Sequence, residues 1–174
     1  MGYIFWGYFC ILFSLHFTIG SIQLDLPPDF LGYILIFAGL RQMSFQSYFF
    51  QRGKPFAVIL AVLSFLQAPI SIFELSVLIG TILLLLLDDK MIRGICEIEE
   101  KQQIALGGKT LRTVWNVKVI FSVCMVILWV AHSAIISVAL ITMVMIQIVF
   151  LVYIYKVKKG CEGQPWMNTK EEKE

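Results

Sequence analysis

Charged residues are scarce in this chain of 174 residues, at 15%, while hydrophobic residues make up 59%. A globular domain normally contains roughly 25% charged and about 45–50% apolar residues. The apolar residues also occur in long blocks rather than at the spacing of one helix face. This composition excludes an ordinary soluble domain and a disordered chain, and it indicates a small polytopic membrane protein.

Cysteine is also scarce, and its four positions are too scattered for a disulfide framework or a CxxC site. These positions are Cys10, Cys96, Cys124 and Cys161. No Lys or Arg precedes the first apolar run, and no A-x-A-like cleavage pattern supports a signal peptide. The run is also too long for the apolar region of a signal peptide. We therefore expect residues 3–22 to form a first membrane span that is retained.

Patterns of covalent catalysis and nucleotide binding are missing as well. A Ser-His-Asp or Cys-His set would have to be assembled from distant residues. The segment Gly107-Gly108-Lys109-Thr110 looks like the end of a phosphate-binding P-loop, but the motif requires glycine where the chain has Gln103. We predict a non-enzymatic protein with no catalytic residue and no cofactor, and with neither a nucleotide nor a nucleic acid as partner.

The apolar runs predict an all-α fold of six transmembrane helices arranged as three hairpins. A hydrocarbon core of about 30 Å needs roughly 20 helical residues, with about 17 to 25 as the usual range. The predicted spans are residues 3–22, 30–43, 55–68, 72–87, 115–131 and 134–155. Between the fourth and fifth spans, 88–109 is expected to be a cytoplasmic amphipathic segment, and 156–174 a disordered cytoplasmic tail.

The distribution of charge predicts the orientation. All 14 Lys and Arg residues follow the second, fourth or sixth span, when Lys118 is counted with those after the fourth. The ionisable residues of the other three connections are Asp25, Asp29, Glu74 and His132, with no Lys or Arg among them. The positive-inside rule places the basic connections and both termini in the cytoplasm, for a protein of the bacterial cytoplasmic membrane.

The second span is short, and a re-entrant segment is the alternative to a full crossing. A re-entrant segment would place Arg41, Arg52 and Lys54 on the same side as Asp25 and Asp29. The charge distribution disfavours that arrangement, so we expect the second span to cross the membrane.

The polar segment after the fourth span keeps helical periodicity. Its apolar residues Met91, Ile95 and Ile98 recur at steps of four and three. It also carries two i,i+4 charge pairs in the favourable orientation, Asp89 with Arg93 and Glu97 with Lys101. A solvated connecting helix is the favoured interpretation, and a helix that docks a partner is the alternative.

Small residues mark the expected packing faces, because helices in lipid associate where their backbones approach closely. Gly7 lies on such a stripe in the first span, and Gly32 and Gly39 lie a heptad apart in the second. Ala57, Ala61 and Ser64 form a similar stripe in the third. These stripes predict a compact bundle and do not identify a ligand.

Ionisable residues near the outer face give the only candidate binding site. His16, Glu74 and His132 are the candidates for a metal or proton site, since imidazole and carboxylate groups serve both roles. However, Glu74 has capping-box spacing from Ser71, and His132 lies in a tight turn. A structural role is therefore the favoured interpretation of all three.

The stretch from Pro28 to Leu40 reads P-D-F-L-G-Y-I-L-I-F-A-G-L. It resembles the P-D-F-x-G-Y-x-L-x-x-x-G-L motif of small uncharacterised multi-pass membrane proteins of low-GC Gram-positive bacteria. A second, weaker similarity to that group is Ile92-Arg93-Gly94-Ile95. The resemblance implies a bacterial cytoplasmic membrane and transfers no site or activity.

Three functional hypotheses follow from the sequence. The favoured one is an accessory, regulatory or immunity-type subunit that acts through contacts with another membrane protein or with a second copy of itself. Its basis is the small-residue stripes and the amphipathic segment, without a visible buried charge pathway. The alternative is a small transporter or channel whose outward entrance holds the His and acidic residues. A membrane-embedded enzyme ranks third.

Overall fold

A computed structural model describes residues 1–12, 18–19, 22–23, 28–67, 73–130 and 136–162. Within these ranges the chain forms helices α1 (Gly2–Leu12), α2 (Pro28–Met43), α3 (Tyr48–Gln67), α4 (Phe73–Gln102), α5 (Gly108–Val130) and α6 (Ile136–Glu162). A two-residue strand β1 (Thr18–Ile19) pairs antiparallel with β2 (Ile22–Gln23). The predicted all-α class is confirmed, apart from this small hairpin.

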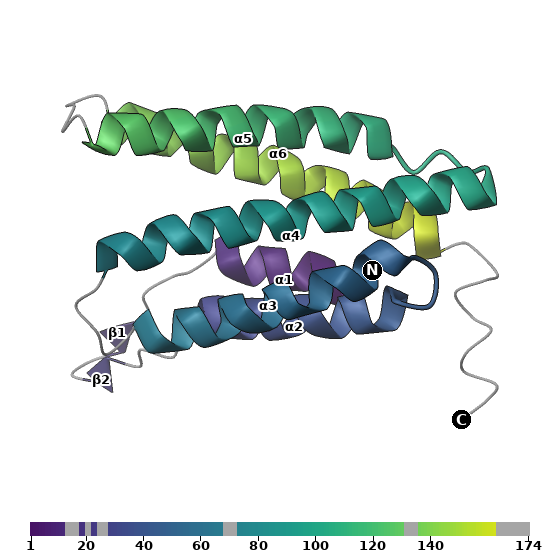
Figure 1. Ribbon diagram of the computed structural model, residues 1–174, viewed down its shortest axis with the longest axis horizontal. Helices are drawn as coiled ribbons and strands as arrows, with labels where there is room; N and C mark the ends of the chain where they lie inside the picture. Colours follow the sequence, from purple (N-terminus) through teal and green to yellow (C-terminus); the bar gives the residue numbers. More distant parts are fainter. Residues whose placement is uncertain (13–17, 20–21, 24–27, 68–72, 131–135, 163–174) are drawn as a thin grey trace.

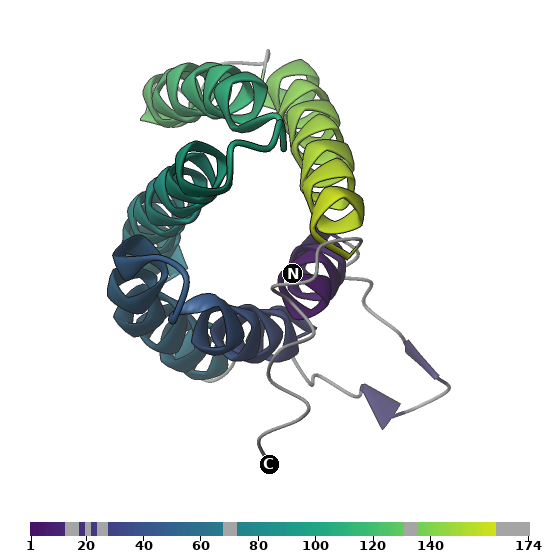
Figure 2. The same ribbon diagram turned by 90° about the vertical axis from the view of Figure 1, so that its right-hand side faces the viewer.

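The helices form a closed ring in which successive helices run antiparallel (Figures 1 and 2). Each helix packs against its neighbours in the sequence, and α6 also packs against α1, which closes the ring. The hairpin of α5 and α6 makes its main contacts with the rest of the chain through α4 and α1. The ring therefore consists of a four-helix unit and a hairpin that meet at two seams.

One end of the ring holds Met1, the connections 44–47 and 103–107, and Cys161, and we call it the basic end. Most of the described Lys and Arg residues lie toward this end, although Lys118 lies within α5 and is buried, whereas Asp29 is in the first turn of α2 at the opposite end. The charge separation that the sequence shows between alternate connections is thus also a separation between the two ends of the ring.

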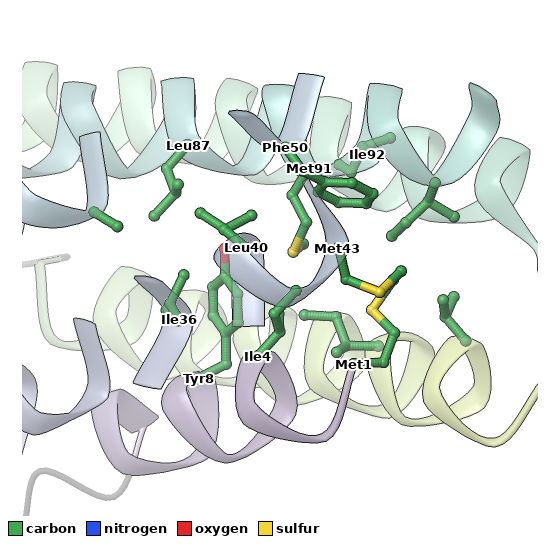
Figure 3. Packing of buried hydrophobic residues seen from close by; sticks show 14 of the residues in the cluster. Met1, Ile4, Tyr8, Ile36, Leu40, Met43, Phe50, Leu87, Met91 and Ile92 are labelled. Atoms are coloured by element: carbon green, nitrogen blue, oxygen red, sulfur yellow. The ribbon is translucent and has the colours of Figure 1, made fainter. Parts of the chain in front are cut away.

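Buried side chains from all parts of the ring fill its interior (Figure 3). Ile4 of α1, Ile36 and Leu40 of α2 and Leu87 of α4 are fully buried there. Met91, Ile95 and Ile98, whose spacing predicts one helix face, belong to this core rather than to a solvated connecting helix. Because that face lies in the interior, it is not free to dock a partner helix.

The outside of the ring carries many exposed apolar side chains, contributed by every helix. They include Trp6, Ile34, Val62, Ile82, Ile120 and Val144. By length and composition, two of the described helices could cross a membrane, within Gly108–Ile127 and Ile141–Cys161. The other helices are shorter or carry more charge, so the predicted six-span topology is not supported by this criterion.

Two predicted boundaries were wrong. The first span was expected to continue as one helix to residue 22, but the described residues beyond α1 form strands, with Thr18 opposite Gln23 and Ile19 opposite Ile22. The β-branched residues Thr18, Ile19 and Ile22 favour a strand at this position. The tail was expected to be disordered from residue 156, but α6 continues to Glu162, because Val157 and Cys161 pack into the core. Residues 163–174 lie outside the described part.

The amphipathic segment continues α4 without a break and ends at Gln102, before the expected stop at Gly107-Gly108. Gln103 has a positive φ of 54°, which ends the helix, and Gly107 has a φ of 86°, a conformation that favours glycine. The Glu99 carboxylate accepts hydrogen bonds from the backbone N–H groups of Leu106 and Gly107, both at 2.6 Å, and of Gly108 at 3.0 Å. The Glu99 side chain thus fixes the backbone of the connection that leads into α5.

We expect Glu99→Ala to lower the free energy of unfolding by about 2 kcal/mol, because three backbone N–H groups lose a charged acceptor. Thermal melting in mild detergent, followed by circular dichroism, would measure the change. Glu100→Ala is the matched control, since Glu100 is exposed and has no hydrogen-bond or ion-pair partner among the described residues. Equal melting temperatures for the two variants would contradict the role of Glu99.

A candidate site in the ring interior

Three polar side chains meet in the interior of the ring, and we call them the central network: Tyr8 of α1, Asp88 of α4 and Lys118 of α5. The Tyr8 hydroxyl donates a hydrogen bond to Asp88 Oδ1. Lys118 Nζ donates to Asp88 Oδ2 at 2.8 Å. Tyr8 and Asp88 are 0% exposed and Lys118 is 1% exposed, so the charged pair has no direct contact with solvent.

Local helix geometry explains how Lys118 reaches Asp88. Side chains on a helix tilt toward its N-terminus. In α5 this direction is toward the basic end, and in the antiparallel α4 it is toward the opposite end. The Lys118 and Asp88 side chains therefore lean toward each other across the contact between α4 and α5. Each charge therefore has its partner in the apolar interior. An unpaired charge buried there would cost free energy.

Phe150 of α6 completes the environment of the central network. Its ring centroid lies 4.9 Å from Lys118 Nζ, which is a cation–π contact. Its ring also meets the Tyr8 ring edge to face, at 5.6 Å between centroids and an interplanar angle of 71°. The ion pair crosses the seam between α4 and α5, and the aromatic contact crosses the seam between α1 and α6. The central network thus joins the α5–α6 hairpin to the four-helix unit.

A further polar group lies one helical turn beyond Lys118. Ser122 is on the same face of α5, four residues later, and is only 4% exposed. Its hydroxyl has no hydrogen-bond partner among the described residues. Buried hydroxyl groups normally have a hydrogen-bond partner. The unpaired Ser122 hydroxyl is therefore an available polar group one helical turn from Lys118.

A second feature is a groove of about 280 Å³ on the outside of α4, near the basic end. We call it the inner groove, and its polar lining is Asp89, Arg93, Glu97, Glu100, Arg112 and Trp115. The predicted ion pairs are both present: Asp89 with Arg93 at 2.9 Å, and Glu97 with Lys101 at 2.6 Å. Hydrogen bonds from Lys101 and Ser47 lower the pKa of Glu97, so this carboxylate is ionised at neutral pH.

Cys96 also lines the inner groove. Burial, followed by the effect of the Glu99 carboxylate, raises the pKa of the Cys96 thiol. A thiol with a raised pKa is a poor nucleophile at neutral pH, because the reactive species is the thiolate. The groove therefore offers ionic groups to a ligand rather than a reactive cysteine.

The candidates predicted from the sequence cannot be compared with each other in the structure. His16 and His132 lie outside the described residues, and for Glu74 only the backbone, in the first turn of α4, is described. Among the residues that the structure describes, no group of three or more His, Cys, Asp or Glu side chains could hold a metal ion. Comparison with protein-family models, curated proteins and solved structures finds no match to this chain.

The sequence contained one sign of the central network that our prediction missed. Lys118 lies inside the predicted span 115–131, and an ionisable residue within a span is a functional candidate by default. The charge distribution groups it with the basic connection instead. Asp88 follows the apolar run that ends at Leu87, where it looked like the start of the cytoplasmic segment. Tyr8 is 80 residues from Asp88 and carries no sequence signal of this contact.

Proposed function

We propose that this chain is a multi-pass protein of the bacterial cytoplasmic membrane, with six spans and both termini on the cytoplasmic side. The exposed apolar residues on the outside of the ring support this placement, because lipid solvates such a surface and water does not. The collection of Lys and Arg residues at the basic end supports the orientation. The antiparallel order of the helices supports an even number of crossings.

Within that membrane, the proposed function is a small, non-enzymatic transporter or channel that carries protons through the ring. The observation that carries this proposal is the buried ion pair of Asp88 and Lys118. Apolar residues of similar volume stabilise a core as well as a buried ion pair does, so stability alone gives no reason for the pair. Ionisable groups buried within membrane spans commonly belong to proton or ion pathways.

The geometry suggests how one proton could be bound and released. A proton that binds an Asp88 carboxylate oxygen forms an O–H bond and leaves a neutral acid, which removes the counter-ion of Lys118. The attraction across the seam between α4 and α5 then weakens, and the α5–α6 hairpin can separate from the four-helix unit. Loss of the same proton on the other side restores the ion pair. The hydroxyls of Tyr8 and Ser122 extend the polar pathway from this pair.

A flux assay in proteoliposomes tests this function. The wild-type protein is expected to dissipate an imposed pH gradient, reported by an entrapped pH-sensitive dye, faster than protein-free liposomes. Asp88→Asn should reduce this rate at least tenfold, because the site can no longer exchange a proton. Asp89→Asn is the matched control and should keep the rate, since Asp89 lies outside the ring interior and pairs with Arg93. Equal rates for both variants would exclude the central network as the proton site.

The accessory role predicted from the sequence is the second candidate function. It is favoured by the exposed charged groups at the basic end, where Glu100 and Arg112 have no hydrogen-bond or ion-pair partner among the described residues. Isolation in mild detergent tests it. A reproducible partner protein would support this role, and a monodisperse protein without one would count against it.

A further inference from the structure

The inner groove lies at the depth where the apolar surface of the ring ends. On α4 the apolar run stops at Leu87, and the first polar residue that lines the groove is Asp89. On α5 the groove reaches Trp115, whose indole N–H donates to the backbone carbonyl of Leu85 at 3.3 Å. Tryptophan is enriched at membrane–water interfaces. In the proposed orientation, the groove therefore opens at the level of the lipid headgroups of the inner leaflet.

Charged residues of both signs line the inner groove. Arg112 is exposed and has no hydrogen-bond or ion-pair partner among the described residues, and Glu100 is in the same situation. Arg93 and Glu97 also line the groove, each already paired within α4. A ligand that brings one anionic and one cationic group could therefore satisfy Arg112 and Glu100 together.

We propose that the inner groove binds the headgroup of a zwitterionic aminophospholipid, of the phosphatidylethanolamine type. The phosphate would accept hydrogen bonds from the Arg112 guanidinium, whose planar donors match phosphate oxygens in pairs. The primary ammonium would donate to the Glu100 carboxylate. The acyl chains would lie along the exposed apolar residues beside the groove, such as Leu86 of α4 and Val117 of α5.

The groove distinguishes this headgroup from other lipid headgroups. The volume of about 280 Å³ has room for a phospholipid headgroup. Three carboxylates and two guanidinium groups line it, so a purely anionic headgroup would meet more repulsion than attraction. A choline headgroup has no N–H to donate to Glu100 and would lose that contact. Hydrogen bonds to charged groups contribute strongly where the site is partly shielded from water.

A lipid also fits the groove better than a protein partner does. Stable protein interfaces depend on a central cluster of buried aromatic or aliphatic residues. The apolar residues of this part of α4, Met91, Ile95 and Ile98, are buried inside the ring. Trp115 is half-buried, and its indole N–H is already bonded within the chain. Phe49 and Ile92 also line the groove, so its charged groups lie beside apolar residues, as they would at the junction of a lipid headgroup and its acyl chains.

The test uses the full-length protein purified in mild detergent and mixed with phosphatidylethanolamine, phosphatidylglycerol or phosphatidylcholine. Native mass spectrometry counts the lipids retained, and a photoactivatable phosphatidylethanolamine followed by peptide mapping locates them. We expect preferential retention of phosphatidylethanolamine and crosslinks near Arg112. Arg112→Gln and Glu100→Gln should each lower retention at least tenfold. Lys109→Gln should not, because Lys109 is an exposed cation of α5 that does not line the groove.

Three results would overturn the proposal. Equal retention of all three lipids would show non-selective lipid contact, and preference for phosphatidylglycerol would show an anionic-lipid site. A protein partner that is captured by the wild type and lost in Arg112→Gln, without selective lipid retention, would show a protein-docking surface. All variants lie on the exposed surface, so their folding is expected to be intact. The outcome does not depend on proton flux, so the two proposals can fail separately.

Discussion

Replacing Asp88 with alanine is expected to lower the free energy of unfolding by about 3–5 kcal/mol, because it leaves the buried Lys118 ammonium without a counter-ion. Tyr8 would lose its acceptor in the same step, which adds an unpaired hydroxyl to the ring interior. The measurement is unfolding in mixed detergent micelles, followed by circular dichroism. This is the largest effect that we expect from a single substitution in the described part of the chain.

Removing both charges should restore most of this loss. In Asp88→Asn combined with Lys118→Met, no unpaired charge remains, because Asn replaces Asp at nearly the same volume and the unbranched Met side chain replaces the Lys118 methylene chain. The difference between the double variant and the sum of the two single variants then gives the coupling energy of the pair. Asp89→Ala is the matched control and should cost less than about 1 kcal/mol, since its ion pairs with Lys90 and Arg93 are partly exposed. A double variant as unstable as Asp88→Ala would contradict this account.

The second large effect is expected at Gly7, where α1 and α2 lie in close contact. A Cβ atom at this position would lie 2.6 Å from the carbonyl oxygen of Gly32 and 2.9 Å from the backbone nitrogen of Ile36. Both are backbone atoms of α2, so neither can move aside without shifting the helix. We expect Gly7→Ala to destabilise the fold by about 1–3 kcal/mol through this overpacking.

Gly80→Ala in α4 is the control for Gly7→Ala. There the added Cβ would meet only a side-chain methyl of Leu63 at 3.6 Å, which is an ordinary contact. The substitution should be neutral or stabilise the helix by up to about 1 kcal/mol, because alanine favours a helix more than glycine does. Thermal melting of the two variants in the same detergent makes the comparison. Similar melting temperatures would show that the approach of α1 and α2 is not a tight packing site.

The features that sequence analysis predicted correctly depend on local spacing. The steps between Met91, Ile95 and Ile98 predict a helix with these residues on one face, and α4 does extend through them. The pairs Asp89–Arg93 and Glu97–Lys101 form because residues four apart are neighbours on any α-helix. The small stripe of Ala57, Ala61 and Ser64 is buried. Helical geometry alone is enough for these predictions.

The features that it missed depend on contacts with other helices. The charge distribution along the chain groups Lys118 with the basic residues after the fourth span, yet α5 begins at Gly108 and Lys118 is buried inside the ring. The helix α6 continues through Lys156 to Glu162 because its inner face is covered by the core, which the polar composition of this segment does not show. The strands β1 and β2 within the expected first span were missed because an apolar run has the same composition in a helix and in a strand.

The sequence alone determined that this chain is helical, apolar and polarised in charge, because composition and periodicity act within one helix or one connection. It also determined that the basic residues follow every second helix, in the connections that alternate with the acidic ones. Only the tertiary structure decided that the ring closes between α1 and α6 and brings Tyr8, Asp88 and Lys118 together. The physical reason is that a buried charge requires a partner, and which partner lies within reach is set by the order and packing of helices far apart in the chain.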